Sequence, residues 1–211
     1  MNKGLFITFE GGEGSGKTTV CKYVYQQLLE AGFDVIYTRE PGGSNIAEQI
    51  RNIILSVENT EMDCRTEALL FAASRRQHLA EKVLPALEAG KIVICDRFVD
   101  SSLVYQGYAR GIGIDEVMTI NQFAIDNHMP DRTIYLDVTP EVGITRIHSR
   151  SDLDRLDIES MTFHHNVHEG YKLVCEKYPD RIMVIDADQD EDTVKEEAIN
   201  MVMEIVNAHV Q

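Results

Sequence analysis

The sequence lacks the features of a membrane protein or of a disulfide-stabilised secreted protein. The apolar stretch near the N-terminus is too short for a membrane span and ends at the acidic Glu10, which also disfavours a signal peptide. Only four cysteines occur among 211 residues, and no two of them form a CxxC pair. We therefore expect reduced thiols and a cytoplasmic protein.

An excess of positive charge is also missing, since the formal net charge is -15. Such a charge repels nucleic acids and anionic membranes, so we expect neither as a partner. A phosphorylated small molecule needs only a local group of cations and backbone N–H groups, so it stays possible. No repeat, low-complexity tract or linker divides the chain, and its length predicts one domain over residues 1–211 with a small insertion.

Five short apolar runs predict the strands of a parallel sheet. They are rich in valine, isoleucine, phenylalanine and tyrosine and show little alternation, which is typical of strands buried on both faces. The runs are Leu5–Phe9, Val35–Thr38, Ile92–Cys95, Ile134–Val138 and Ile182–Ile185. Functional groups of such a sheet collect outside the carboxyl ends of its strands.

Stretches of helical period lie between these runs. The first stripe is Val20, Val24 and Leu28, with Gly32 at the position where the helix should end. The later stripes are Ile46, Ile50, Ile53 and Ile54; Ala68, Leu69, Ala72, Leu79 and Val83; Ile120, Phe123 and Ala124; and Val194, Ala198, Val202, Ile205 and Val206. Alternating strands and helices predict an α/β protein with helices on both faces of the sheet.

A glycine-rich segment after the first predicted strand fits the pattern G-x-x-x-x-G-K-[ST] and opens a predicted helix. Its glycines let backbone N–H groups surround a phosphate, and the helix N-terminus adds favourable partial charge. Lys17 should reach the β- and γ-phosphates of ATP, and the Thr18 hydroxyl should bind Mg²⁺. The predicted ATP-binding residues are Gly11, Gly12, Glu13, Gly14, Ser15, Gly16, Lys17 and Thr18.

Two motifs of other P-loop proteins are absent: the guanine-selective N-K-x-D, and an apolar strand that ends in Asp-Glu. The third strand-like run ends instead in Asp96, Arg97 and Phe98. An arginine beside the P-loop strand would bind the phosphate of a second substrate, and Asp96 is placed to hold Mg²⁺ directly or through water. The alternative is a structural ion pair between Asp96 and Arg97.

Four further segments are polar or aromatic where a buried core would be apolar. They are T-R-E-P-G-G at 38–43, F-A-A-S-R at 71–75, D-R-F-x-D-S-S-x-x-Y-Q-G at 96–107 and L-D-R-L-D at 153–157. With the P-loop, they span nearly the whole chain and resemble the thymidylate kinase family in its bacterial form. The resemblance implies a three-layer P-loop kinase fold: an α/β protein with a five-stranded parallel sheet, helices on both faces and a small lid at about 146–158. It also implies transfer of the γ-phosphoryl group of ATP to dTMP with Mg²⁺, giving dTDP and ADP, by a homodimer.

The resemblance assigns five residues to the thymidine part of the acceptor. Phe71 would stack on thymine, Arg75 would donate to a thymine carbonyl, and Gln106 would pair with the base edge through its amide. Ser102 would lie close to the base. Tyr105 would fill the space of a ribose 2′-hydroxyl and so favour deoxynucleotides. Phe71 lies on an apolar helix, so a plain core position is its alternative.

Further positions correspond to the sugar and phosphate sites of the family. Arg51 and Arg97 would clamp the acceptor phosphate, a task that suits a planar bidentate donor. Glu40 and Glu13 lie where the family handles the sugar 3′-hydroxyl and the metal environment. The alternative for Arg51 is a solvated charge on a helix.

The polar stretch Thr145–Leu156 corresponds to the lid of the family, which closes over ATP and brings arginines to the transferred phosphoryl group. His148 stands where some bacterial relatives have another lid arginine, and we expect Arg150 and Arg155 to be catalytic together with Lys17 and Arg97. His164 and His168 share one helical face, which we interpret as exposed rather than metal-binding.

Two other functions stay open at this point. The acceptor could be another nucleoside monophosphate or a deoxynucleoside, although the set Phe71, Arg75, Tyr105 and Gln106 disfavours it. Alternatively, the chain could be a P-loop nucleotide switch that acts through a protein interaction. The missing guanine motif and the arginine for a second substrate both disfavour a switch.

Overall fold

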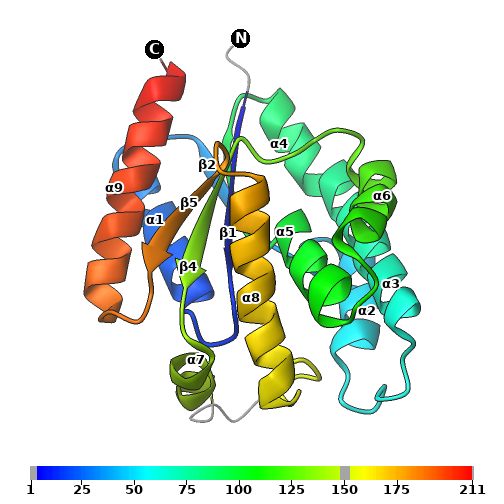
Figure 1. The fold of residues 1–211 in the computed structure, drawn as a ribbon. Helices are drawn as coiled ribbons and strands as arrows, with labels where there is room; N and C mark the ends of the chain where they lie inside the picture. The colour runs from blue at the N-terminus through cyan, green and yellow to red at the C-terminus, as the bar shows by residue number, and fades with distance from the viewer. Residues whose placement is uncertain (1–3, 148–152, 211) are drawn as a thin grey trace.

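A parallel sheet of five strands forms the centre of the computed structural model, which describes residues 4–147 and 153–210 (Figure 1). The strands are β1 (Leu5–Gly11), β2 (Val35–Arg39), β3 (Ile92–Asp96), β4 (Arg132–Asp137) and β5 (Ile182–Asp186). Their order across the sheet is β2-β3-β1-β4-β5. All five predicted strands are confirmed, with ends that differ by one or two residues.

The helices lie between the strands in the chain. They are α1 (Lys17–Glu30), α2 (Asn45–Leu55), α3 (Cys64–His78), α4 (Leu84–Glu88), α5 (Val99–Ser102), α6 (Ile114–Ile125), α7 (Pro140–Ile147), α8 (Met161–Lys177) and α9 (Glu191–Val210). Two wider π-helical segments, η1 (Leu79–Val83) and η2 (Leu103–Ala109), continue α3 and α5. In the described part of the chain, no helix is long and apolar enough to cross a membrane.

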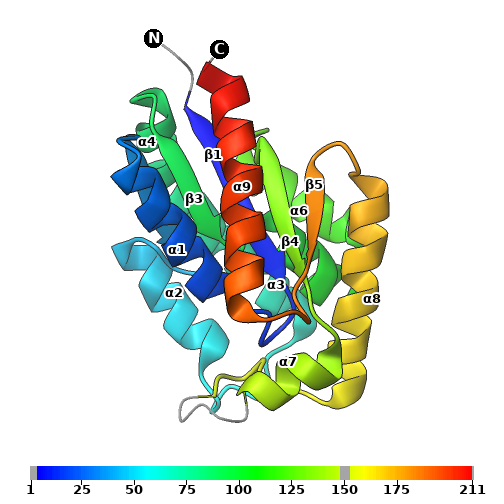
Figure 2. The same ribbon diagram turned by 90° about the vertical axis from the view of Figure 1, so that its left-hand side faces the viewer.

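Helices cover both faces of the sheet, so the predicted three-layer arrangement is confirmed (Figures 1 and 2). On one face, α1 and α9 pack against the strands through the stripes at Val20, Val24 and Leu28 and at Val194, Ala198 and Val202. On the other face lie α3, η1, α4, α5, η2 and α8, while α6 packs on α3 and η2. The three central strands are therefore buried on both sides, which explains why they are apolar without alternation.

The register brings the carboxyl ends of three strands together. Arg39 of β2 pairs with Asp96 of β3, and Asp96 pairs in turn with Phe9 of β1. Glu40, Arg97 and the P-loop follow these positions directly, so all three segments meet at one edge of the sheet.

Three of the predicted helical stripes are wrong in part, since Ile46 and Ile53 of α2 are each 49% exposed and Leu69 of α3 is 57% exposed. The largest difference is in α6. Phe123 of α6 is 91% exposed, while the buried face of this helix is formed by Val117, Asn121 and Ala124. Adjacent residues of an α-helix are about 100° apart around its axis, so Phe123 cannot share the face of Ala124. The predicted stripe on α6 is therefore not one buried face, because Ala124 is buried and Phe123 is exposed to solvent.

Helix α7 ends at Ile147 and α8 begins at Met161, so the predicted lid falls in the connection between them. Arg150 and His148 lie outside the described residues. The described end of the connection is a tight turn in which the Asp154 carboxylate accepts hydrogen bonds from the backbone N–H groups of Leu156 and Asp157.

Candidate active site

The P-loop joins β1 to α1, as its motif predicts. Gly14 and Gly16 have φ angles of 72° and 83°, which only glycine adopts readily. The Lys17 ammonium group donates to the Gly12 carbonyl oxygen at 2.7 Å and to Ser15 Oγ at 3.2 Å. It therefore lies across the loop, where it can reach a bound phosphate.

The loop rests on α7 through direct backbone contact. A Cβ atom on Gly14 would overlap the backbone of Gly143, and one on Gly143 would overlap the Glu13 carbonyl oxygen. Both positions require glycine, because the two backbones leave no room for a side chain.

Arg97 lies at the carboxyl end of β3 and makes the central ion pair of the site. Its guanidinium group donates to Glu13 Oε1 at 2.6 Å and to the Tyr105 hydroxyl oxygen at 3.2 Å. It also donates to the Gly11 carbonyl oxygen and to Ser101 Oγ, both at 3.2 Å. The backbone of Arg97 has a φ of 67°, an uncommon conformation for a residue other than glycine. An outlier of this kind favours a functional role for the residue that adopts it.

The charges of the site are strongly coupled. Burial alone would raise the pKa of Glu13, but Arg97 and Lys17 outweigh it and lower this pKa to about 2. Burial and the nearby Arg97 lower the pKa of Lys17 to about 8. Glu13 is thus ionised at neutral pH and holds two cations beside the P-loop.

Thr18 and Asp96 meet beside the loop, as the sequence predicts. The Thr18 hydroxyl donates to Asp96 Oδ2 at 2.6 Å. Both side chains offer oxygen atoms, the donors that Mg²⁺ prefers. Within residues 4–147 and 153–210, no group of three or more His, Cys, Asp or Glu side chains could hold a metal ion.

A cleft of about 190 Å³ opens in front of these residues. Its lining contains twelve of the residues predicted from the sequence. These are Glu13, Gly14, Gly16, Lys17, Thr18, Glu40, Arg51, Phe71, Asp96, Arg97, Tyr105 and Gln106. The lining also contains residues that the sequence interpretation missed, among them Arg39, Ser101 and Asp157. Arg39 belongs to the T-R-E-P-G-G segment and directly follows the predicted strand Val35–Thr38. This position at the carboxyl end of a strand could have identified it as a site residue.

Two arginines stand on the side of the cleft formed by β2 and α2. Arg51 donates to the Pro41 carbonyl oxygen at 2.9 Å, and Arg39 donates to the same oxygen at 2.8 Å. Arg39 also pairs with Glu48. Burial and the nearby Arg39 lower the pKa of Arg51, which shows that the two cations lie close together in a partly enclosed place. Such a pair favours an anionic ligand.

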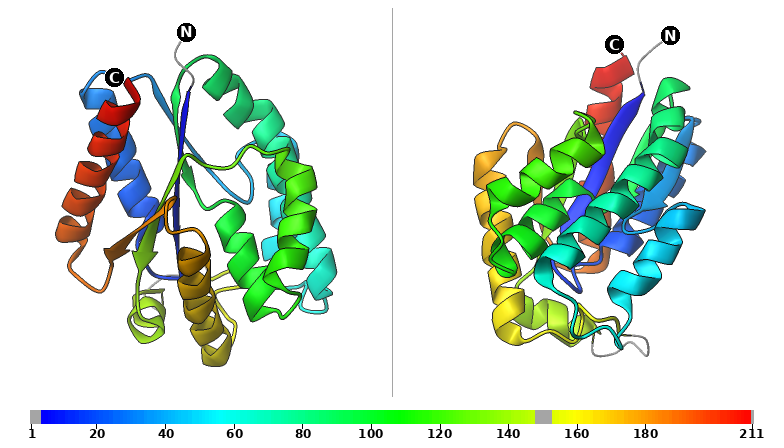
Figure 3. Two further views of the ribbon diagram at one scale, coloured as in Figure 1. Left: turned by 45° about the horizontal axis from the view of Figure 1, so that its top comes forward. Right: turned by 90° about the vertical axis from the view of Figure 1, so that its right-hand side faces the viewer.

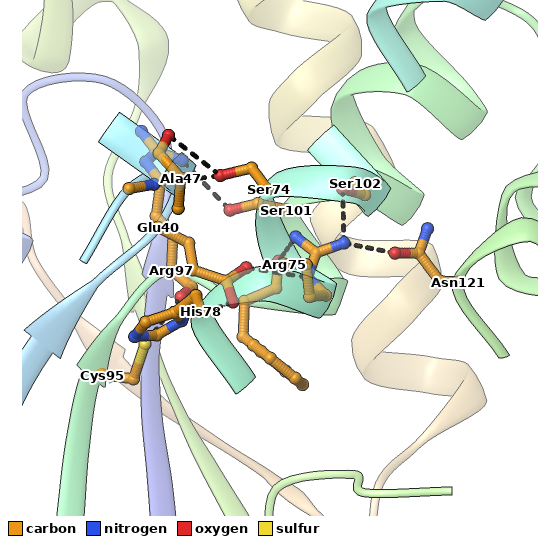
Figure 4. A network of polar contacts seen from close by, with 12 residues as sticks. Glu40, Ala47, Ser74, Arg75, His78, Cys95, Arg97, Ser101, Ser102 and Asn121 are labelled. Atoms are coloured by element: carbon orange, nitrogen blue, oxygen red, sulfur yellow. Dashed lines mark hydrogen bonds and ion pairs between the residues drawn. The ribbon is translucent and has the colours of Figure 1, made fainter. Parts of the chain in front are cut away.

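Arg75 is the centre of a buried network of polar contacts (Figure 4). Its Nε donates to Glu40 Oε2 at 2.7 Å, and its Nη1 donates to Ser102 Oγ at 3.0 Å and to Asn121 Oδ1. Its Nη2 donates to the Phe98 carbonyl oxygen at 2.9 Å. Arg75 is 1% exposed, and neither it nor Ser102 belongs to the lining described above. Both residues hold the wall in place in this structure.

Glu40 shares this network and also faces the cleft. Its second carboxylate oxygen lies 2.9 Å from His78 Nδ1, and His78 Nε2 lies 2.7 Å from the Thr38 hydroxyl (Figure 4). Two partners therefore fix the orientation of the Glu40 carboxylate at the edge of the cleft.

Arg155 is not brought together with Lys17 and Arg97. It is 6% exposed, and it donates to Glu67 Oε2 at 2.6 Å and to the Ile54 carbonyl oxygen at 2.9 Å. Among the described residues, the lining of the cleft does not include it. The guanidinium group of Arg155, which we expected to be catalytic, is instead engaged in a buried ion pair with Glu67.

The interpretation of His164 and His168 as an exposed face is wrong. His164 is 5% exposed, and His168 Nε2 lies 2.9 Å from Asp137 Oδ1. This face of α8 packs against β4 and the P-loop, where burial lowers the pKa of His164. Two histidines four residues apart on a helix suggested an exposed polar face, but tertiary packing covers this face of α8.

The fold and the site together define a class of protein. The P-loop at the end of β1 is in direct contact with Arg97 and lines one cleft with Arg39 and Arg51. The parallel sheet has helices on both faces and carries this cleft at the carboxyl ends of its strands. The site is therefore that of an ATP-dependent phosphotransferase with an anionic acceptor.

Comparisons with known proteins specify the family. The family model for thymidylate kinase matches residues 9–198. The chain is 62% identical over 199 residues to a thymidylate kinase of Clostridium novyi, covering 93% of this chain and 97% of that one. It is 57% identical over 204 residues to a thymidylate kinase of Halalkalibacterium halodurans, covering 96% and 97%. The crystal structure of thymidylate kinase from Ehrlichia chaffeensis superposes with a TM-score of 0.79 at 34% identity, covering 95% of this chain and 99% of that one. The chain belongs to the thymidylate kinase family.

Proposed function

We propose that this chain transfers the γ-phosphoryl group of ATP to dTMP, giving ADP and dTDP, and so supplies dTTP for DNA synthesis. The observation that carries this proposal is a single cleft with a P-loop at one end and Arg51, Phe71 and Gln106 at the other. One end suits a triphosphate, and the other offers a cation, an aromatic ring and an amide to a nucleoside monophosphate.

In this reaction, the acceptor phosphate oxygen attacks the γ-phosphorus in line, and no protein nucleophile is needed. Lys17 and the backbone N–H groups of the loop bind the ATP phosphates. Arg97 lies between the P-loop and the acceptor end, where its guanidinium group can bind the acceptor phosphate and offset charge on the transferred group. Glu13 and Tyr105 hold that guanidinium group in place.

Mg²⁺ fits the oxygen atoms of Thr18 and Asp96, which already lie in contact. The ion would neutralise charge on the phosphates, and most of its remaining ligands would be ATP oxygens and water. Two protein ligands suffice for such a site, because Mg²⁺ bound with nucleotides keeps several waters.

At the acceptor end, we assign Phe71 to stacking on the base and Gln106 to its polar edge. Arg51 binds the acceptor phosphate, and Tyr105 limits the space beside the sugar. Glu40 faces the sugar hydroxyls, while Arg75 and Ser102 support the pocket from behind.

We retain residues 146–158 as a lid within one kinase domain. The assignment of Arg150 to the transferred phosphoryl group depends on the sequence alone. For Arg155, the ion pair with Glu67 supports a role that anchors this end of the lid segment better than a direct catalytic one.

We also propose a homodimer that forms through α2, α3 and α6. These helices pack side by side, as the right panel of Figure 3 shows, and each exposes apolar side chains. Ile46 and Ile53 are each 49% exposed, Leu69 is 57% exposed and Phe123 is 91% exposed. Because water-exposed apolar side chains on adjacent helices favour association, Phe123→Arg should produce a monomer in analytical ultracentrifugation, whereas Leu173→Arg on α8 should not. A dimeric Phe123→Arg protein would place the contact elsewhere.

A cytoplasmic location agrees with the four free cysteines of the described chain.

A coupled ADP-release assay with dTMP, dUMP, UMP, dCMP and dGMP tests the proposed activity. We expect the highest kcat/KM with dTMP. Equal signals with all five acceptors would remove dTMP as the substrate and leave the P-loop assignment standing. Slow ATP hydrolysis without any phosphorylated acceptor would instead favour a nucleotide switch.

A further inference from the structure

A buried carboxylate lies directly behind the base end of the cleft. Glu67 of α3 is 1% exposed and accepts hydrogen bonds from three side chains of other segments. Gln106 Nε2 donates to its Oε1 at 2.8 Å, and Arg155 Nη2 donates to its Oε2 at 2.6 Å. Arg110 adds two longer contacts at 3.3 and 3.4 Å. Among the described residues, the cleft lining contains Gln106 but not Glu67.

Glu67 is ionised at neutral pH. Burial alone would raise its pKa, but the hydrogen bond from Gln106 and the guanidinium groups of Arg110 and Arg155 outweigh burial and lower the pKa. An ionised carboxylate only accepts hydrogen bonds. Its neighbour must therefore present an N–H group to it.

This requirement fixes the Gln106 amide, which could otherwise face either way. With Nε2 bound to Glu67, the Oε1 atom is left for the cleft, and within the described residues it accepts no hydrogen bond. The second hydrogen of Nε2 also stays available, because Glu67 takes only one. Gln106 therefore offers an acceptor and a donor side by side.

We propose that Glu67 is a positioning residue that sets the base specificity of the site by holding the Gln106 amide in one orientation. This inference rests on the proposed function, because it takes the cleft to bind a pyrimidine nucleotide. Thymine and uracil present an N3–H donor beside the O4 acceptor, which matches the acceptor and donor of Gln106. Cytosine presents an N3 acceptor beside an amino donor, which opposes Gln106 at both atoms. Leaving such groups unpaired in a closed site is costly, so the orientation selects against cytosine.

Arg155 and Arg110 have a defined part in this arrangement. A neutral Glu67 would carry an O–H donor and could bind Gln106 Oε1, which would turn the amide around. Two cations keep the carboxylate ionised despite its burial, and Arg110 is itself held by Glu159 at 2.6 Å. The amide orientation thus depends on charges that never touch the substrate.

The test is Glu67→Gln, assayed with dTMP and dCMP as acceptors. The new carboxamide can donate to Gln106 Oε1, so both amide orientations become accessible. We expect the ratio of kcat/KM for dTMP over dCMP to fall at least about tenfold, through a higher KM for dTMP and a gain with dCMP, while the KM for ATP stays unchanged. Glu159→Gln is the matched control, because it makes the same chemical change in the same ion-pair network without contacting Gln106. Its ratio should stay at the wild-type value.

An unchanged ratio in a folded Glu67→Gln protein overturns the inference. Equal losses in Glu67→Gln and Glu159→Gln also overturn it, since the effect would then be structural. If Glu67→Gln does not fold, wild-type protein is titrated calorimetrically with dTMP and with dTMP methylated at N3. Binding of the methylated nucleotide at least about 100-fold weaker supports the inference, and equal binding refutes it. Wild-type protein that phosphorylates none of these acceptors would refute the proposed function, whereas a dTMP-selective wild type with an unaltered ratio in Glu67→Gln would refute only the role of Glu67.

Discussion

Two substitutions of Arg97 distinguish the effect of its positive charge from the effect of its planar guanidinium geometry. Arg97→Ala removes a guanidinium group that makes four hydrogen bonds, the shortest of them the 2.6 Å pair with Glu13. Arg97→Lys keeps the charge and can still pair with Glu13. A lysine is a point charge without the planar fork, so it cannot reach Glu13, Tyr105 and a phosphate together.

The size of the expected effect follows from losses of comparable donors in other enzymes. Loss of one positioned donor that stabilises developing charge lowers kcat by about 10²–10³-fold, which we expect for Arg97→Ala. Arg97→Lys should retain part of this, with a loss of about tenfold to 100-fold, because the charge remains but the geometry does not. ATP affinity should change little in either variant, since we propose that Lys17 and the loop backbone bind the triphosphate.

Steady-state assays that vary ATP and dTMP separately would measure these effects, with ATP affinity determined by calorimetry. Arg132→Ala is the matched control, because this exposed arginine lies on β4 and, among the described residues, donates only to the backbone of its neighbour Asp131. If kcat of Arg97→Ala stayed within about threefold of wild type, the placement of Arg97 at the reacting phosphates would be wrong.

Two further predictions concern pH and packing. Burial and the nearby Asp100 raise the pKa of Glu10 from 4.5 to about 7, so its stabilising contribution is complete below pH 4.5 and is lost as the pH rises through 7. Urea titrations should therefore show that the free energy of unfolding of the wild type falls relative to that of Glu10→Gln between these pH values, by up to about 3 kcal/mol. A difference between the two proteins that does not vary with pH would contradict this. Gly143→Ala should raise the KM for ATP and lower Tm, because the new methyl group would press against the backbone of Glu13; unchanged values for both would show that α7 moves freely away from the P-loop.

The parts of the site that depend on the P-loop motif and on the ends of the parallel strands could be predicted from the sequence. The P-loop is a continuous segment whose spacing determines its conformation, and Thr18 and Asp96 meet because parallel strands end at the same edge of the sheet. The register of β1 with β3 then places Arg97 beside Glu13. These relations need only the strand pattern and the order of elements.

Pairings that depend on how helices and loops pack on one another could not be predicted in this way. Arg155 is 88 residues from Glu67, and Arg75 is 46 residues from Asn121. A sequence shows that an arginine is present, but its partner is decided by how α2, α3 and the lid connection pack. The burial of His164 and the exposure of Phe123 were missed for the same reason, since helical period identifies a face but not what covers it.

The central claim is that the chain moves a phosphoryl group from ATP to dTMP. The most direct measurement follows the label from [γ-³²P]ATP in the presence of dTMP and Mg²⁺ and separates the products by chromatography. We predict that the label appears in dTDP in a one-to-one ratio with the ADP formed. Label that appears as inorganic phosphate, with no labelled dTDP, would contradict the claim.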